Sequence, residues 1–142
     1  MPRRSARLTL HLLPSSCAAL AILLAAPGHP ASRQEDLAAA EAAAKAAAGT
    51  PEGRKFEETM GQAFGKEHSV TIQRCARETK GRDLKDFALF LKVDGAGVVE
   101  RALVEPETAL SACVESRMKG WQAPAPPHPG HWVRVSVLLK GK

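Results

Sequence analysis

One stretch of the chain, residues 87–104, constrains the fold more than any other. It reads FALFLKVDGAGVVERALV, and large apolar residues occupy alternate positions in its first half. Alternate side chains of an extended chain share one face, so this pattern predicts a strand with one buried side. Residues 94–97 tolerate positive φ and predict a turn, after which a β-branched run resumes. The stretch is therefore expected to form a β-hairpin.

A hairpin alone is at best marginally stable in water, so other elements must cover it. A third strand is predicted over residues 132–140, where valine alternates with polar residues. Two amphipathic helices are predicted at residues 52–79 and 108–119, because apolar side chains recur there at steps of three and four. The expected fold is α+β, with element order α-β-β-α-β. It has a three-stranded antiparallel sheet, the first hairpin strand in its centre and both helices on one face.

The N-terminal third of the chain has a different composition. Residues 1–31 join a basic start to the apolar run CAALAILLAA and then to small and helix-breaking residues. This is the form of a signal peptide, and an uncleaved membrane anchor over residues 8–26 is the competing interpretation. Residues 32–51 contain EDLAAAEAAAKAAAG, a helix-forming sequence without a large apolar stripe. We expect a semi-rigid spacer that docks on nothing, followed by one domain over residues 52–142.

The net charge of +5 does not indicate binding to nucleic acid. Arg3, Arg4 and Arg7 lie in the expected signal peptide, and without them 17 of the 20 basic residues stand against 15 acidic ones. The remaining net charge of +2 leaves no basic arm or patch. The expected partners therefore exclude nucleic acid.

Two cysteines remain once the expected signal peptide and its Cys17 are removed. Cys75 and Cys113 each lie on the apolar side of a predicted helix. Two helices that share one face of a sheet bring such residues together, and disulfides are common in exported proteins. A Cys75–Cys113 disulfide is therefore predicted. A redox-active pair is disfavoured because the chain lacks Cys-x-x-Cys spacing.

Recognisable catalytic constellations are missing from the sequence. It has no Ser-His-Asp spacing, phosphate-cradling glycine loop or nucleophile elbow, so no enzyme activity, cofactor or metal is expected. The alternative is a small periplasmic metal-binding protein or enzyme that uses His68, His128 and His131. Histidines in a proline-rich loop are more often simply solvated, which favours a protein without these activities.

The features that follow Cys75 resemble, in their order, the C-terminal domain of the TonB superfamily, and most closely its AgmX/PglI-like branch. They are a helix with a cysteine at Cys75, a turn with Gly97 and Val98, a helix with Cys113 and Val114, a Trp-x-x-Pro motif at residues 121–124, and a hydrophobic last strand. The resemblance covers about residues 70–140. It implies a non-enzymatic protein-binding module of the bacterial periplasm. The alanine-rich spacer differs from the Pro-rich spacer of energy-transducing TonB proteins, so a stand-alone envelope module is expected.

The last predicted strand is the expected interaction edge. With the first hairpin strand in the centre, the other two strands lie at edges, where unpaired N–H and C=O groups can template another strand. Arg134 is the only charge among residues 132–139, whereas the other edge carries Glu100, Arg101 and Glu105. The residues assigned to this edge are Trp132, Val133, Arg134, Val135, Val137 and Leu139. If the N–H of Val135 points outward, Val135→Pro is expected to abolish association.

The expected partner at this edge is another envelope protein or a second copy of the chain. The expected location is the periplasm or the outside of the cell. Contact with a membrane is expected only if residues 1–31 are retained.

Overall fold

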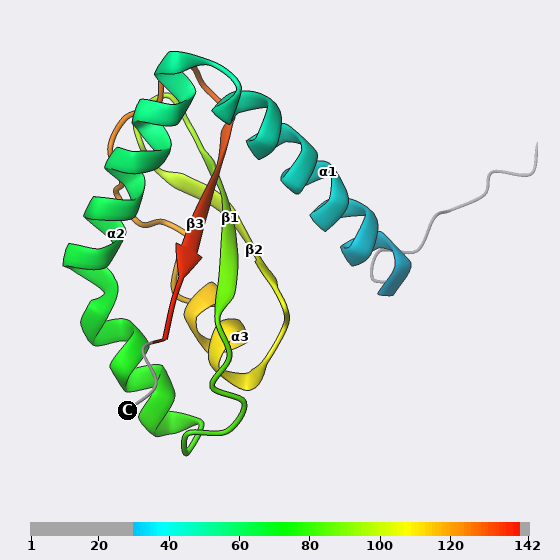
Figure 1. The fold of residues 1–142 in the computed structure, drawn as a ribbon, viewed down its shortest axis with the longest axis vertical. Helices are drawn as coiled ribbons and strands as arrows, with labels where there is room; N and C mark the ends of the chain where they lie inside the picture. Colours follow the sequence, from blue (N-terminus) through cyan, green and yellow to red (C-terminus); the bar gives the residue numbers. More distant parts are fainter. Residues whose placement is uncertain (1–29, 140–142) are drawn as a thin grey trace, which may run out of the picture.

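The computed structural model describes residues 30–139, over which the chain forms three helices and three strands (Figure 1). The predicted signal peptide, and the anchor that competes with it, lie outside the described residues. In chain order the elements are α1 (Pro30–Ala48), α2 (Pro51–Glu78), β1 (Phe87–Val93), β2 (Val99–Glu105), α3 (Ala109–Glu115) and β3 (His131–Val137).

The three strands form one antiparallel sheet in the order β2-β1-β3. The predicted α+β fold with β1 in the centre is therefore confirmed. β1 pairs with β3 without interruption from Phe87–Val137 to Val93–His131. Its pairing with β2 shifts register between Lys92 and Val93.

The hairpin turn forms as its sequence predicts. The Oδ1 atom of Asp94 accepts hydrogen bonds from the N–H groups of Ala96 and Val98, at 2.9 and 2.8 Å. Gly97 has φ 89°, and a Cβ atom there would lie 2.4 Å from the carbonyl oxygen of Ala123. Glycine is therefore required at this position, both for its backbone conformation and for the close approach of a second chain segment.

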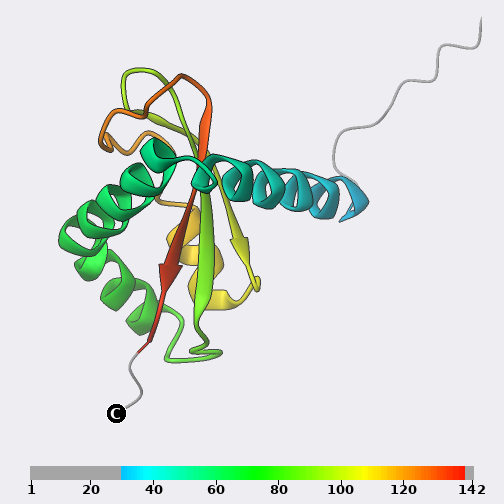
Figure 2. The same ribbon diagram turned by 45° about the horizontal axis from the view of Figure 1, so that its top comes forward.

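One face of the sheet is covered by α2 and α3 (Figure 2). Both helices start at a threonine N-cap: the side chain of Thr50 accepts from the N–H of Gly53, and Thr108 forms a capping box with Ser111. The buried residues of this face are large and apolar. They include Phe56, Met60, Phe64, Leu89, Leu91, Val104, Leu110, Val114, Met118, Val133 and Val135. The prediction that both amphipathic helices share one face is confirmed.

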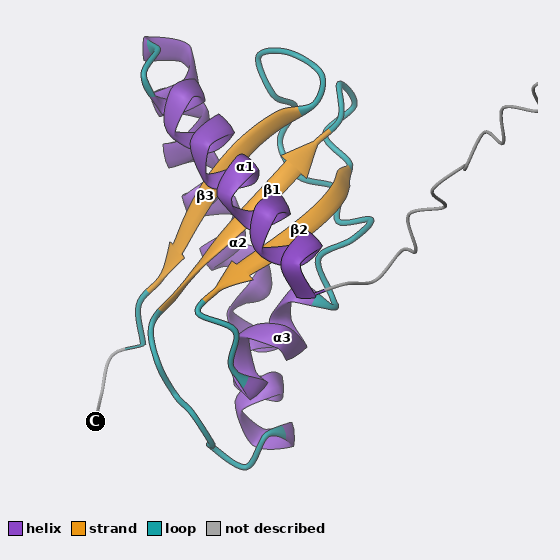
Figure 3. Cartoon of the chain, turned by 90° about the vertical axis from the view of Figure 1, so that its right-hand side faces the viewer, coloured by secondary structure: helices purple, strands orange, loops and turns teal. Residues whose placement is uncertain are grey.

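The opposite face of the sheet is covered by α1, which crosses the strands diagonally in Figure 3. The segment is helical as predicted, but the expectation that it docks on nothing is wrong. Ala40 and Ala44 are buried against Ala88, Phe90 and Leu103, and Leu37 and Trp132 pack at the margin. Alanine makes this contact possible because its small side chain lets the helix backbone approach the sheet closely.

The tight corner between α1 and α2 fixes the direction of α1 relative to α2. Gly53 lies in the first turn of α2, and a Cβ atom there would be 1.8 Å from the carbonyl oxygen of Ala47.

Ion pairs hold the far end of α1 to the domain. Arg33 contacts Glu107 and Glu115, each at 2.8 Å, and Asp36 pairs with Arg101.

Candidate functional site

The side chains of β3 are divided between the two faces of the sheet. Val133, Val135 and Val137 are buried in the core below α2 and α3, while Arg134 and Ser136 are exposed. Trp132 is half-buried and packs at the margin of the α1 contact. A partner at this edge would therefore contact the backbone of β3 more than its side chains, because three of the six predicted edge residues direct their side chains into the protein.

The backbone of β3 alternates between its neighbour and the outer edge. The N–H of Asp94, just after β1, donates to the carbonyl oxygen of Val98 and so points toward β2, which leaves Leu89 pointing toward its partner Val135 in β3. The N–H of Leu139, just after β3, donates to Oδ1 of Asp86 and so points toward β1. Successive residues of a strand point their N–H and C=O groups to opposite sides. It follows that Val135 faces β1, whereas the residues that face outward are Trp132, Arg134 and Ser136. The N–H of Val135 thus points inward, contrary to the outward orientation considered from sequence.

The outer edges of β3 and β2 differ in how they are paired. Beside β2, the N–H of Val99 donates to Trp121 at 3.0 Å, the N–H of Gly120 donates to Val99 at 2.8 Å, and Val98 bridges to Gln122. Among residues 30–139, no comparable backbone hydrogen bond reaches the outer side of β3. Within the described part of the chain, β3 is therefore the edge whose outward backbone groups have no backbone partner.

An apolar groove of about 690 Å³ adjoins the C-terminal end of β3. It runs between the last turns of α2 and the strand, and two of its lining residues, Leu84 and Leu138, are 53% and 74% exposed. The lining residues are Ser69, Ile72, Gln73, Ala76, Leu84, Leu110, Val137, Leu138 and Leu139. The predicted edge residue Leu139 belongs to this groove, but the contributions of α2 and Leu84 were missed from sequence because they come from distant segments.

The other side of the β3 edge is charged. Arg134 lies beside Glu41, Lys45 and Glu57 around a cavity of about 360 Å³. It is exposed and, within the described residues, forms no ion pair. Its guanidinium is available to a carboxylate on an added strand.

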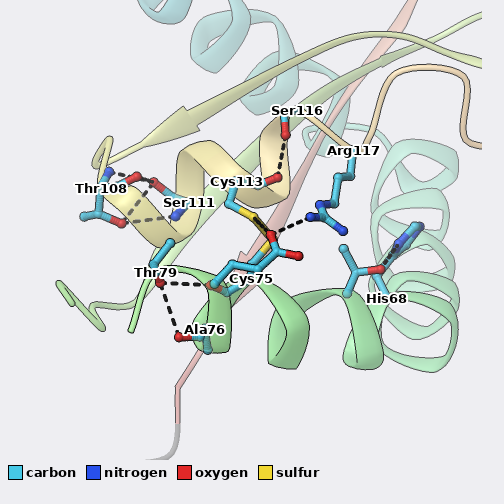
Figure 4. Close-up of a disulfide and its surroundings, with 11 residues drawn as sticks. His68, Cys75, Ala76, Thr79, Thr108, Ser111, Cys113, Ser116 and Arg117 are labelled. Atoms are coloured by element: carbon cyan, nitrogen blue, oxygen red, sulfur yellow. Dashed lines mark hydrogen bonds and ion pairs between the residues drawn. A yellow bond between two sulfur atoms is a disulfide. The ribbon is translucent and has the colours of Figure 1, made fainter. Parts of the chain in front are cut away.

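The predicted disulfide is present between Cys75 on α2 and Cys113 on α3, with the Cα atoms 5.7 Å apart (Figure 4). Glu78 and Arg117 form an ion pair at 2.6 Å beside it. Over residues 30–139, the one group of three metal-ligand side chains is Cys75, Glu78 and Cys113. Both cysteines are consumed by the disulfide, so this group serves to join the two helices.

Trp121 is held by residues of α2. Its Nε1–H donates to Glu67 at 2.8 Å, and its ring lies 4.5 Å from that of His68 in an edge-to-face contact. Burial lowers the pKa of His68, against the opposing effect of Glu67. The Nε2 atom of His68 is buried without a hydrogen-bond partner among the described residues. The imidazole is thus kept neutral and serves as a packing element.

The three histidines of the alternative function do not converge on one site. His131 packs on Phe56 with ring centroids 4.9 Å apart, and Nδ1 of His131 lies 3.1 Å from Nε2 of His128. His68 follows Phe56 by twelve positions on the same helix, which separates them by roughly 18 Å at 1.5 Å per residue. Two histidines are therefore brought together and the third is not.

Comparison of the chain with protein-family models, with curated proteins and with solved structures finds no match. The resemblance to the TonB C-terminal domain therefore stays an expectation from the sequence. Across the described part of the chain, none of the helices combines the length and apolarity needed to cross a bilayer.

Proposed function

We propose that this chain is a non-enzymatic protein-binding module of the bacterial cell envelope. It acts in the periplasm or outside the cell and binds an extended segment of another protein along the outer edge of β3. The observation that carries this proposal is the unpaired β3 edge beside the apolar groove of α2 and Leu84. The resemblance to the TonB superfamily supports the same class, and the Cys75–Cys113 disulfide is consistent with an oxidising compartment.

The two sides of the edge define the chemistry of the partner segment. An added strand gains affinity from main-chain hydrogen bonds and specificity from alternate side chains. Side chains on the α2 side would enter the groove at Ile72, Leu84 and Leu139, which selects apolar residues. Side chains on the other side would lie next to Arg134, where an acidic residue gives a favourable cross-strand pair. The expected ligand is an extended segment that alternates apolar with polar or acidic residues.

A proline substitution tests the edge directly. Ser136→Pro removes an outward-facing N–H at an exposed position, where proline is tolerated in an edge strand. Ser136→Ala keeps that N–H and serves as the matched control. A photo-crosslinker at Leu138 is used to capture partners from an envelope fraction, and mass spectrometry identifies them. Capture is expected to persist with Ser136→Ala and to be lost with Ser136→Pro, while circular dichroism shows both variants folded.

Equal capture of the same protein by the Ser136→Pro variant would contradict binding at this edge. Val135→Pro provides a further control, because its N–H faces β1 and its loss is expected to unfold the sheet. Sedimentation velocity on the purified chain shows whether the captured partner is a second copy.

The location is tested separately by the intact mass of the protein recovered from the envelope. Loss of the first 26 to 31 or so residues is expected for a cleaved signal peptide. A mass that includes residues 1–26 would support the anchor and a role closer to that of energy-transducing TonB proteins.

A further inference from the structure

The turn that leads into β3 brings two imidazoles together. His131 is the first residue of β3 and is 2% exposed, while His128 lies three positions earlier on the surface. Gly130, with φ 70°, turns the chain between them. As a result, Nδ1 of the buried ring lies 3.1 Å from Nε2 of the exposed ring.

The spacing of these nitrogens suits two ligands of one metal ion. With metal–nitrogen bonds of about 2.0 to 2.1 Å, two ligands are about 3.3 Å apart at a tetrahedral angle and about 2.9 Å apart at a right angle. The observed 3.1 Å lies between these values. The ring centroids are only 4.6 Å apart and the ring planes are inclined by 47°. The two nitrogens also share an N–H···N hydrogen bond whose donor depends on the tautomer, so a bound metal ion would take the place of that proton.

The ring of His131 is fixed from the side of the core. The ring of Phe56 holds it in place by an edge contact. The nearby cation is Lys92, whose ammonium group lies 3.7 Å from the carboxylate of Glu100 and is therefore partly neutralised.

We propose that Nε2 of His128 and Nδ1 of His131 bind one divalent transition-metal ion of the class of Zn²⁺ or Cu²⁺. No third histidine, cysteine or carboxylate completes a larger group within residues 30–139, so water or an added ligand fills the other positions. This is an open, exchangeable site, in contrast to a closed structural one. It lies at the N-terminal end of β3, whereas the apolar groove adjoins the C-terminal end.

Titration of the full chain with ZnCl₂ at pH 7.5 tests the site by calorimetry, and ¹⁵N NMR of the imidazoles identifies the nitrogens that bind. His128→Gln removes one ligand at an exposed position, and His68→Gln removes a histidine elsewhere as the matched control. We expect one equivalent of Zn²⁺ to bind, with an affinity at least about tenfold weaker in His128→Gln and unchanged in His68→Gln. The Nδ1 resonance of His131 is expected to shift on Zn²⁺ addition.

Three results would overturn the proposal. They are absence of zinc binding by the wild-type chain, equal affinity in His128→Gln, and equal losses in both variants. The last result would indicate general binding by scattered imidazoles. Circular dichroism on each variant excludes unfolding as the cause of a loss.

Discussion

The two faces of the sheet are covered by different means. The face below α2 and α3 buries large side chains such as Leu89, Leu91 and Met118, and the Cys75–Cys113 disulfide joins its two helices. The opposite face buries little more than Phe90 and Leu103 under the alanines of α1. The first face therefore contributes most of the apolar burial that stabilises the domain.

This difference indicates two levels of local stability. Helix α1 is held by small side chains, by its corner with α2 and by partly exposed ion pairs, which contribute at most about 1 kcal/mol each. Opening of α1 is therefore expected at a lower free energy than unfolding of the sheet with α2 and α3. The following predictions test that order.

Removal of the disulfide is expected to have the largest effect. The bond closes a loop with a sequence separation of 38 residues between α2 and α3. In the chain-entropy model, the double variant Cys75→Ala, Cys113→Ala lowers the free energy of unfolding by about 4 kcal/mol. Urea denaturation followed by fluorescence measures this. A loss below about 1 kcal/mol would mean that the first face does not depend on the crosslink.

Truncation of two neighbouring residues of β1 compares the contributions of the two faces to stability. Leu91 is fully buried in the first face, and Phe90 is 3% exposed under α1. Leu91→Ala is expected to lower the free energy of unfolding by about 3 kcal/mol, because α2 and α3 cannot close around the cavity. Phe90→Ala is expected to lower it by less, since α1 can settle onto the smaller residue. Denaturation curves that rank the two in the reverse order would contradict this comparison.

The corner between α1 and α2 is tested by Gly53→Ala. The added Cβ would lie 1.8 Å from the carbonyl oxygen of Ala47, so α1 must shift, at a cost of about 2 kcal/mol. Hydrogen exchange is expected to become faster in α1 while β1 stays protected. Gly61→Ala is the matched control, because a Cβ there meets nothing within 4 Å and the substitution favours the helix. Similar exchange in both variants would contradict the role of the corner.

Acid is expected to weaken the first face by a smaller amount. Burial lowers the pKa of His68 and of His131 from the ordinary value of 6.5, and both rings contact residues of α2. Below pH 6.5 the unfolded chain takes up protons that the folded chain does not, so stability falls as pH drops toward the lowered pKa values. Denaturation between pH 8 and pH 5 measures this. Loss of the pH dependence in a His68→Gln, His131→Gln variant is expected, and an unchanged slope would assign it to other groups.

The sequence predicted the elements of the fold in which large apolar side chains recur at regular spacing. Alternation of Phe87, Leu89, Leu91 and Val93 identified β1, and three- and four-residue spacing identified the helices that carry the two cysteines. The β3 edge followed from strand order, which was inferred correctly. The sequence did not predict that the N–H of Val135 points inward. Which residues of a strand direct their N–H groups toward the neighbouring strand depends on the register of the pairing and not on the residue type.

What the sequence determined by itself was periodic burial: which segments form strands or helices, and which side of each is apolar. The docking of α1 required tertiary structure, because alanine gives no amphipathic contrast and its contact depends on how closely the backbone can approach Phe90. The apolar groove at Leu84 and Leu138 and the meeting of His128 with His131 likewise required it. Each joins side chains through the path of the chain in space, and a periodic pattern carries no information about that path.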